Sequence, residues 1–190
     1  MLAVFLYNKF NHKLRLCAMG MVLVCGVFSL VNRSVAQDVF EDQIKSVFLY
    51  NLAHFVTWPN SIVQGASTFN IGVYGSVSFQ AVLQQTVETE TKDGRELVVS
   101  RINDPDDITA LCRILFVTKE AKGDWEKIKA KIADLPILTV SDGEDFINRG
   151  GMVSLLRQNK KIQIEVDYKR VQQAGLSMSA KLLRLARVVE

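Results

Sequence analysis

A series of short apolar runs, separated by amphipathic segments, constrains the fold of this chain more than any other feature. The clearest run is Arg113–Thr118 (RILFVT), and Phe69–Tyr74 and Pro136–Val140 are similar. Such runs are typical of strands buried on both faces of a parallel sheet. Between them, Ser76–Val87 and Asp124–Ala133 place apolar residues at helical spacing. This alternation predicts an α/β fold, with a mainly parallel sheet and helices on both faces.

The remaining segments predict one more strand, a hairpin and two closing helices. Glu96–Ile102 continues the strand pattern. Gln158–Lys160 have turn character and lie between strands at Met152–Leu156 and Lys161–Val166. We therefore expect an antiparallel hairpin at one edge of the sheet. Tyr168–Gly175 and Ser179–Val189 have helical patterns. The second holds more apolar residues than one stripe requires, so it is either largely buried or partly covered by a second subunit.

The first 36 residues have the layout of a secretory signal peptide. A basic start without acidic residues precedes an uncharged apolar run at Leu16–Val31, and Ser34 and Ala36 are small residues of the kind that a signal peptidase reads. The run is shorter than the roughly 20 residues of a membrane span, which favours cleavage after about Ala36 over an uncleaved anchor. The sequence therefore predicts a signal peptide at residues 1–36 and a single domain at residues 37–190.

The charge of the expected mature chain excludes a nucleic-acid partner. Of the 23 basic and 20 acidic residues, the signal peptide holds four basic and no acidic ones, which leaves 19 and 20. The net charge then falls near −1, and no basic patch stands out for nucleic acid. The apparent basic character of the chain belongs mostly to its export signal.

A helix is expected at the start of the mature domain, from about Val39 to Val56. Its apolar residues form a wide stripe, and Pro59 disfavours helical geometry at Trp58, where the helix should end. His54 lies in this helix and is the only histidine after residue 36. Zinc sites built from paired histidines are therefore excluded, and a packed or half-exposed structural histidine is a simpler interpretation than a catalytic one.

Only one cysteine, Cys112, follows the signal peptide, so the mature monomer can form no internal disulfide. Its place at the start of an apolar run favours a buried structural thiol over a reactive one. Acidic residues after the strand at residue 140, Asp142, Glu144 and Asp145, could hold a divalent metal. They suit a helix start equally well, and we expect neither a metal nor a cofactor.

The junction Gly72–Ser76 joins a strand to a helix and offers a second kind of site. Free backbone N–H groups at such a junction can hold an anion, with help from the hydroxyls of Ser76 and Ser78. The alternative is a tight turn in which Ser76 only caps the helix. Gly150-Gly151, which precedes the next strand, is expected to allow positive φ at a turn.

Several motifs, taken in order along the chain, point to one family. They are Leu49–Pro59 (LYNLAHFVTWP), Ile71–Gly75 (IGVYG), Cys112–Val117 (CRILFV), Leu138–Asp142 (LTVSD) followed by Phe146 and Gly150–Met152, and Leu176–Ala186 (LSMSAKLLRLA). In this order they resemble the YfiR family of bacterial periplasmic proteins, over nearly all of the mature chain.

The resemblance implies a periplasmic regulator and no enzymatic activity. The family's namesake binds the periplasmic sensor domain of an inner-membrane diguanylate cyclase and represses it, which lowers cyclic di-GMP and biofilm formation. An outer-membrane lipoprotein sequesters this repressor, and the namesake is a homodimer stabilised by disulfides. Cys112 has no partner here, so this sequence departs from the family's disulfides. A sensor kinase is a further possible partner, and a periplasmic small-ligand-binding sensory module is the alternative function.

Four residues are the expected anchors for a protein partner. Tyr50, Trp58 and Tyr168 are aromatic, and Arg184 is charged; such residues supply much of the binding energy at interfaces. Ser76 and Ser78 are the expected ligand-binding residues under the alternative function.

Overall fold

The computed structural model describes residues 39–63, 65–159 and 161–189. Residues 42–190 form one compact unit. The expected signal peptide, residues 1–36, lies outside the described residues. No helix among the described residues is both long and apolar enough to span a bilayer.

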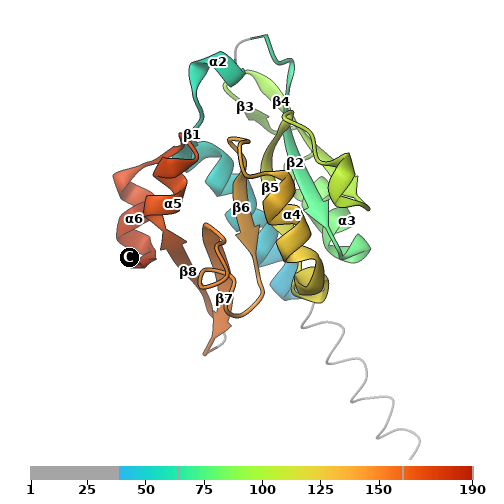
Figure 1. Ribbon diagram of the computed structural model, residues 1–190. Coiled ribbons are helices and arrows are strands. Elements are labelled where there is room, and N and C mark those ends of the chain that lie inside the picture. Colours follow the sequence, from blue (N-terminus) through green and yellow to red (C-terminus); the bar gives the residue numbers. More distant parts are fainter. Residues whose placement is uncertain (1–38, 64, 160, 190) are drawn as a thin grey trace, which may run out of the picture. The chain divides into compact units, whose positions relative to one another are not determined.

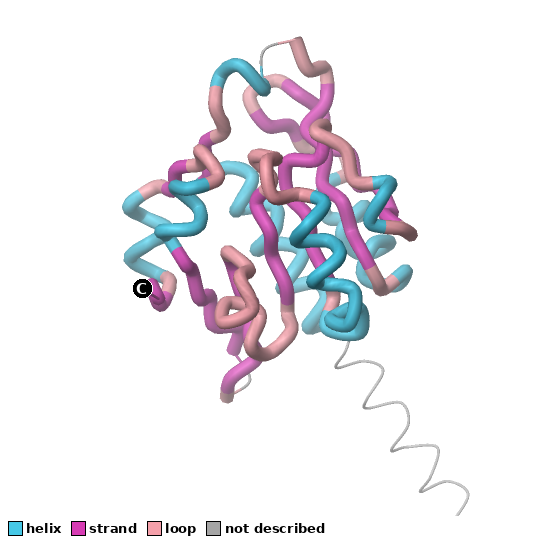
Figure 2. The backbone as a smooth tube through the Cα atoms, viewed as in Figure 1, coloured by secondary structure: helices cyan, strands magenta, loops and turns pink. Residues whose placement is uncertain are grey.

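Helices and strands alternate through most of the chain (Figures 1 and 2). A helix over residues 39–55 comes first. The elements that follow are β1 (Val56–Thr57), α2 (Asn60–Val63), β2 (Thr68–Tyr74), α3 (Val77–Val87), β3 (Thr91–Lys92), β4 (Arg95–Ile102), the 3-10 helix η1 (Pro105–Asp107), β5 (Cys112–Val117), the 3-10 helix η2 (Lys119–Asp124), α4 (Trp125–Lys131), β6 (Leu138–Ser141), β7 (Val153–Gln158), β8 (Lys161–Asp167), α5 (Tyr168–Gln173), β9 (Ser177–Met178), α6 (Ala180–Leu185) and β10 (Arg187–Val189).

An eight-stranded sheet organises the domain, in the order β10-β8-β7-β6-β5-β2-β4-β3. The strands β7, β6, β5, β2 and β4 are parallel to their neighbours in this series. β7 and β8 form an antiparallel hairpin. The short strands β1 and β9 pair separately, in antiparallel fashion. The expected mainly parallel sheet with an antiparallel hairpin toward one edge is therefore confirmed.

Side chains of β5 show why the sheet is covered on both faces. Ile114 and Phe116 belong to a core that includes residues of helix 39–55 and α3, such as Leu49 and Phe79. Leu115 and Val117 point to the other face and share a second core with Trp125 and Ile128 of α4. Successive residues of a strand face opposite ways, so this apolar run needs a helical layer on each side. Figure 1 shows α4 in front of the sheet and α3 behind it.

The last segment differs from the expected helix over Ser179–Val189. α6 ends at Leu185, because Ala186 adopts an extended conformation (φ −96°, ψ 153°). The chain then continues as β10, which pairs with β8 in parallel. Two β-branched residues, Val188 and Val189, suit this strand better than a helix. The segment is not largely buried either, because Leu182 is buried whereas Leu185 and Val188 are exposed.

Two smaller expectations concern helix 39–55 and Cys112. The helix ends at Phe55, slightly earlier than expected, since Val56 and Thr57 pair with β9 as a short strand. Cys112 is buried, as expected, and its thiol donates to the carbonyl oxygen of Ile114 at 3.1 Å.

Candidate functional site

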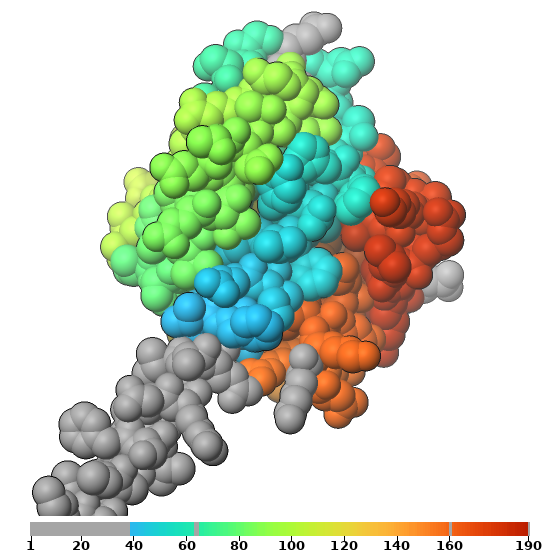
Figure 3. Space-filling model, turned by 180° about the vertical axis from the view of Figure 1, so that it is seen from behind, coloured from blue at the N-terminus to red at the C-terminus, as the bar shows by residue number. Residues whose placement is uncertain are grey.

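The end of helix 39–55 and helix α6 together form an exposed surface that is basic and apolar. The Ser179 N–H donates to the Phe55 carbonyl oxygen at 2.8 Å, which joins the two segments. Figure 3 shows them side by side on one face of the molecule. We call the group Phe55, Lys181, Arg184 and Leu185 the α6 surface.

Local helix geometry explains why these side chains face outward. Leu182 is buried and fixes the inner face of α6, whereas Lys181, Arg184 and Leu185 are exposed. Residues three and four positions apart lie on one side of a helix, so Arg184 and Leu185 lie next to Lys181. Leu185 is 70% exposed, the largest value among the exposed large apolar side chains of the described residues. The exposed face of α6 therefore presents an apolar side chain next to two cations.

The α6 surface contains two cations, Lys181 and Arg184. The Lys181 ammonium lies 5.5 Å from the centre of the Phe55 ring, a cation–π distance. Among the described residues, neither Lys181 nor Arg184 forms an ion pair. The neighbouring cation Arg187 is different, because its guanidinium pairs with Glu165 at 2.7 Å. The surface therefore offers two cations to an acidic partner.

Tyr50 and His54 lie one turn apart near the end of helix 39–55. The Tyr50 hydroxyl donates to a Glu90 carboxylate oxygen at 2.9 Å. This hydrogen bond is the main cause of the raised pKa of Tyr50, followed by burial and the charge of Glu90. The exposed ring of His54 meets the Tyr50 ring edge-on, with centres 4.8 Å apart. Among the described residues, no serine or acidic side chain bonds His54, so a catalytic triad is not assembled around it.

The other two expected aromatic anchors, Trp58 and Tyr168, are buried or half-buried. Trp58 is 4% exposed and packs edge-on against Phe69, with ring centres 5.0 Å apart. Tyr168 opens α5 and is half-buried against the core. Among the residues that the structure describes, no hydrogen bond, ion pair or ring contact joins these four expected anchors. Arg184 is the one that belongs to the α6 surface.

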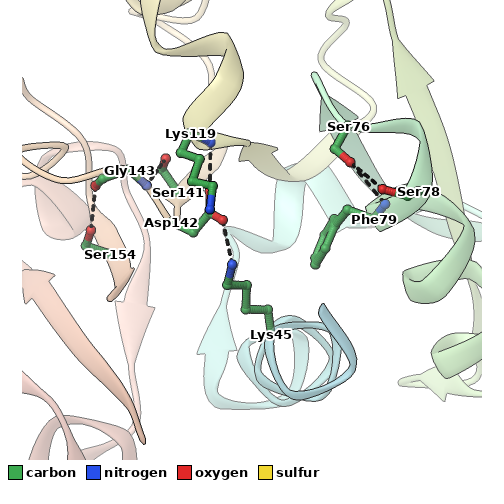
Figure 4. A network of polar contacts seen from close by, with 9 residues as sticks. All are labelled: Lys45, Ser76, Ser78, Phe79, Lys119, Ser141, Asp142, Gly143 and Ser154. Carbon is green, nitrogen blue, oxygen red and sulfur yellow. Dashed lines mark hydrogen bonds and ion pairs between the residues drawn. The ribbon is translucent and has the colours of Figure 1, made fainter. Parts of the chain in front are cut away.

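A polar group lies where β2, β5 and β6 end. The Ser76 side chain caps α3 by accepting the Phe79 N–H at 3.2 Å. The hydroxyls of Ser76 and Ser78 are 2.9 Å apart. The two expected ligand-binding serines are therefore together at the start of α3 (Figure 4).

A buried ion pair ties helix 39–55 to the end of β6 (Figure 4). The Lys45 ammonium lies 2.6 Å from Asp142 Oδ2, and the two side chains are 3% and 8% exposed. The other oxygen of Asp142 accepts the Lys119 N–H at 2.8 Å. Asp142 therefore has structural partners, and no cluster of potential metal ligands occurs among the described residues.

The sequence contains a signal for the role of Lys45. Lys45 lies four residues before Leu49, on the buried face of the helix, and a lysine at such a position requires an acidic partner. For Asp142, the sequence indicates only a metal ligand or a helix start. The exposure of Leu185 cannot be predicted from the sequence, because its segment has the pattern of a single continuous helix.

The comparison with known families agrees with the motifs. A domain family described as YfiR/HmsC-like matches residues 42–187. No curated protein matches the chain. The matched range extends from helix 39–55 to the first residue of β10, so it includes both sites described above. The chain belongs to the YfiR/HmsC-like family, a family of periplasmic regulators.

Proposed function

We propose that this protein binds the periplasmic sensor domain of an inner-membrane signalling enzyme, a diguanylate cyclase, and represses it. Repression would lower cyclic di-GMP and biofilm formation. The observation that carries the proposal is the family match over residues 42–187. A sensor kinase with a similar periplasmic domain is the other partner of this class.

The α6 surface is the proposed contact with that sensor domain. It combines Arg184, a residue type that is enriched at interfaces, with a lysine and an exposed leucine. Because Lys181 and Arg184 lack acidic partners among the described residues, the sensor domain should present acidic side chains around an apolar depression. Tyr50 and Tyr168 lie at half-buried positions and would contribute at the margin, whereas Trp58 would support the surface from within the core.

Export and assembly belong to the same proposal. The signal peptide is removed after about Ala36, and residues 37–190 act in the periplasm as one domain. A homodimer and sequestration by an outer-membrane lipoprotein would follow the family's namesake.

The test combines capture with a cellular readout. The protein, purified from the periplasm and immobilised, should capture a membrane diguanylate cyclase from a detergent extract of the source bacterium. Arg184→Glu should weaken capture at least tenfold, because it reverses a charge at the centre of the α6 surface. Lys127→Glu is the matched control: Lys127 is 78% exposed on α4, which packs on the opposite face of the sheet.

Cyclic di-GMP provides the second readout. Deleting the gene should raise cyclic di-GMP, and the wild type or the Lys127→Glu variant should restore the low level. The Arg184→Glu variant should fail to restore it. Unchanged cyclic di-GMP after deletion, together with capture of no signalling enzyme, would contradict the proposed function.

A small-ligand sensor is the second candidate function. The observation in its favour is the pairing of Ser76 and Ser78 at the start of α3. The chemistry of that site is developed next.

A further inference from the structure

The start of α3 lies at a point where the sheet changes the direction of its connections. β2 is followed by α3, which contributes Phe79 to the core behind the sheet. Its neighbour β5 is followed by η2 and α4, which contribute Trp125 to the core on the other face. In open α/β sheets, ligands bind outside the carboxyl ends of the strands at such a point.

Backbone donors face outward at this position. The first N–H groups of a helix have no acceptor within the helix itself. Ser76 Oγ accepts the N–H of Phe79, which leaves the N–H groups of Val77 and Ser78 for a ligand. The hydroxyl of Ser78 is exposed beside them, and no acidic residue lies in the first turn of α3.

Thr118 supplies an independent observation. It is 2% exposed, and its hydroxyl has no hydrogen-bond partner among the described residues. Thr118 stands at the start of η2, yet its side chain does not cap that helix. The hydroxyl instead lies against Gly75, where a Cβ would overlap it. A buried hydroxyl without a partner is unfavourable, so its position against Gly75, directly before the cap of α3, suggests a partner that arrives with a ligand.

Charge at this edge also suits an anion. The side chain of Lys119 is exposed directly after Thr118 and forms no ion pair among the described residues. The nearby carboxylate of Asp142 is already neutralised by Lys45. Gly75 has φ +115°, and because it has no side chain, its backbone is not covered where it meets Thr118.

We propose that the start of α3, formed by Gly75, Ser76 and Ser78 and faced by the Thr118 hydroxyl, binds a small oxyanion. The ligand is the phosphate or the carboxylate group of a periplasmic metabolite. It accepts hydrogen bonds from the N–H groups of Val77 and Ser78, and from Ser78 Oγ. If the segments that follow β2 and β5 move slightly apart, the Thr118 hydroxyl donates a further hydrogen bond to the ligand.

The experiment titrates the full exported protein, freed of phosphate, with inorganic phosphate and, separately, with acetate. Binding is followed by calorimetry and by the amide NMR shifts of Val77 and Ser78. Saturable shifts with phosphate alone would assign a phosphate group, and shifts with acetate would assign a carboxylate. No saturable shift with either anion up to tens of millimolar would overturn the proposal.

Two variants make the test specific. Thr118→Val keeps the shape of the side chain, and should weaken binding about tenfold while leaving the unliganded protein at least as stable. Ser78→Ala should weaken binding similarly. Thr91→Val, at an exposed position in β3, is the control and should bind normally. Wild-type affinity in both Thr118→Val and Ser78→Ala would overturn the assignment, whatever the outcome for the cyclase.

Discussion

Gly151 is a residue whose role only the packing around it explains. The expected positive φ occurs at its neighbour Gly150 (φ +100°), whereas Gly151 needs no unusual backbone conformation. A Cβ at Gly151 would instead overlap the ring of Phe146, which packs on Trp125 with ring centres 4.5 Å apart. The glycine is therefore required by a close approach of the backbone to an aromatic ring.

We expect Gly151→Ala to lower the free energy of unfolding by about 1–3 kcal/mol, because the Phe146 ring must move within a packed core. The measurement is urea denaturation. Gly123→Ala is the control, since nothing lies within 4 Å of a Cβ there, and it should change stability by no more than about 0.5 kcal/mol. Equal effects of the two substitutions would contradict the role assigned to Phe146.

Cys112 makes stability depend on alkaline pH. Burial raises the pKa of its thiol from 9.0 to about 11, and the smaller effects of the Gly72 hydrogen bond and the Arg113 charge oppose the rise. The folded protein therefore holds this proton more tightly than the unfolded chain. The resulting stability is complete below pH 9 and is lost as the pH rises toward 11, by about 2–3 kcal/mol. The raised pKa values of Tyr50 and Tyr74 act in the same direction.

Cys112→Ala should therefore reduce the loss of stability between pH 8.5 and about 10.5. Urea denaturation of the variant and the wild type at both pH values measures the difference, and any constant cost of the cavity cancels. An identical alkaline loss in both proteins would show that Cys112 does not contribute to it.

At the scale of elements, the Lys45–Asp142 pair holds helix 39–55 against the end of β6. Both side chains are almost fully buried, so removing one partner leaves the other charge without its counterion in a region of low polarity. This differs from the exposed pairs on the helix surfaces, which water and salt screen.

We expect Lys45→Met to lower the free energy of unfolding by about 3–5 kcal/mol. Lys131→Met is the matched control, because Lys131 pairs with Asp106 at 3.1 Å with side chains 40% and 87% exposed. That substitution should cost at most about 1 kcal/mol. Urea denaturation compares the two, and a similar small loss in both would mean that the buried pair adds little.

For the whole molecule, we expect that export and cleavage after about Ala36 determine which chain acts in the cell. The intact mass of the protein purified from the periplasm should correspond to a chain that begins at Gln37. Ala36→Leu should block this processing, because the peptidase reads a small residue there. A cell-free product of the full sequence provides the reference mass. Finding that same mass in the periplasmic protein would contradict cleavage.

Local patterns in the sequence predict this fold better than patterns that depend on distant residues. The apolar run at β5 predicted a strand buried on both faces, and both cores confirm it. Pro59 bounded the first helix to within a few residues. The predicted helix over Ser179–Val189 was wrong at its end. Leucine and valine at residues 182–189 fit a helical stripe, and it is the pairing with β8 that makes β10 a strand. Among the candidate site residues, the pairing of Ser76 with Ser78 follows from their spacing, whereas the burial of Trp58 depends on its contact with Phe69.

The α/β class, the hairpin, the family and the expectation of a regulator could all be predicted from residue order. These depend on periodicity, turn residues and ordered motifs, which are properties of neighbours along the chain. The three-dimensional fold was needed to show that Asp142 pairs with Lys45, that Thr118 faces Gly75, and that helix α6 joins Phe55 in an exposed basic surface. Each of these contacts brings together residues from different elements. Their proximity follows from how the sheet orders its strands, and no local pattern records that order.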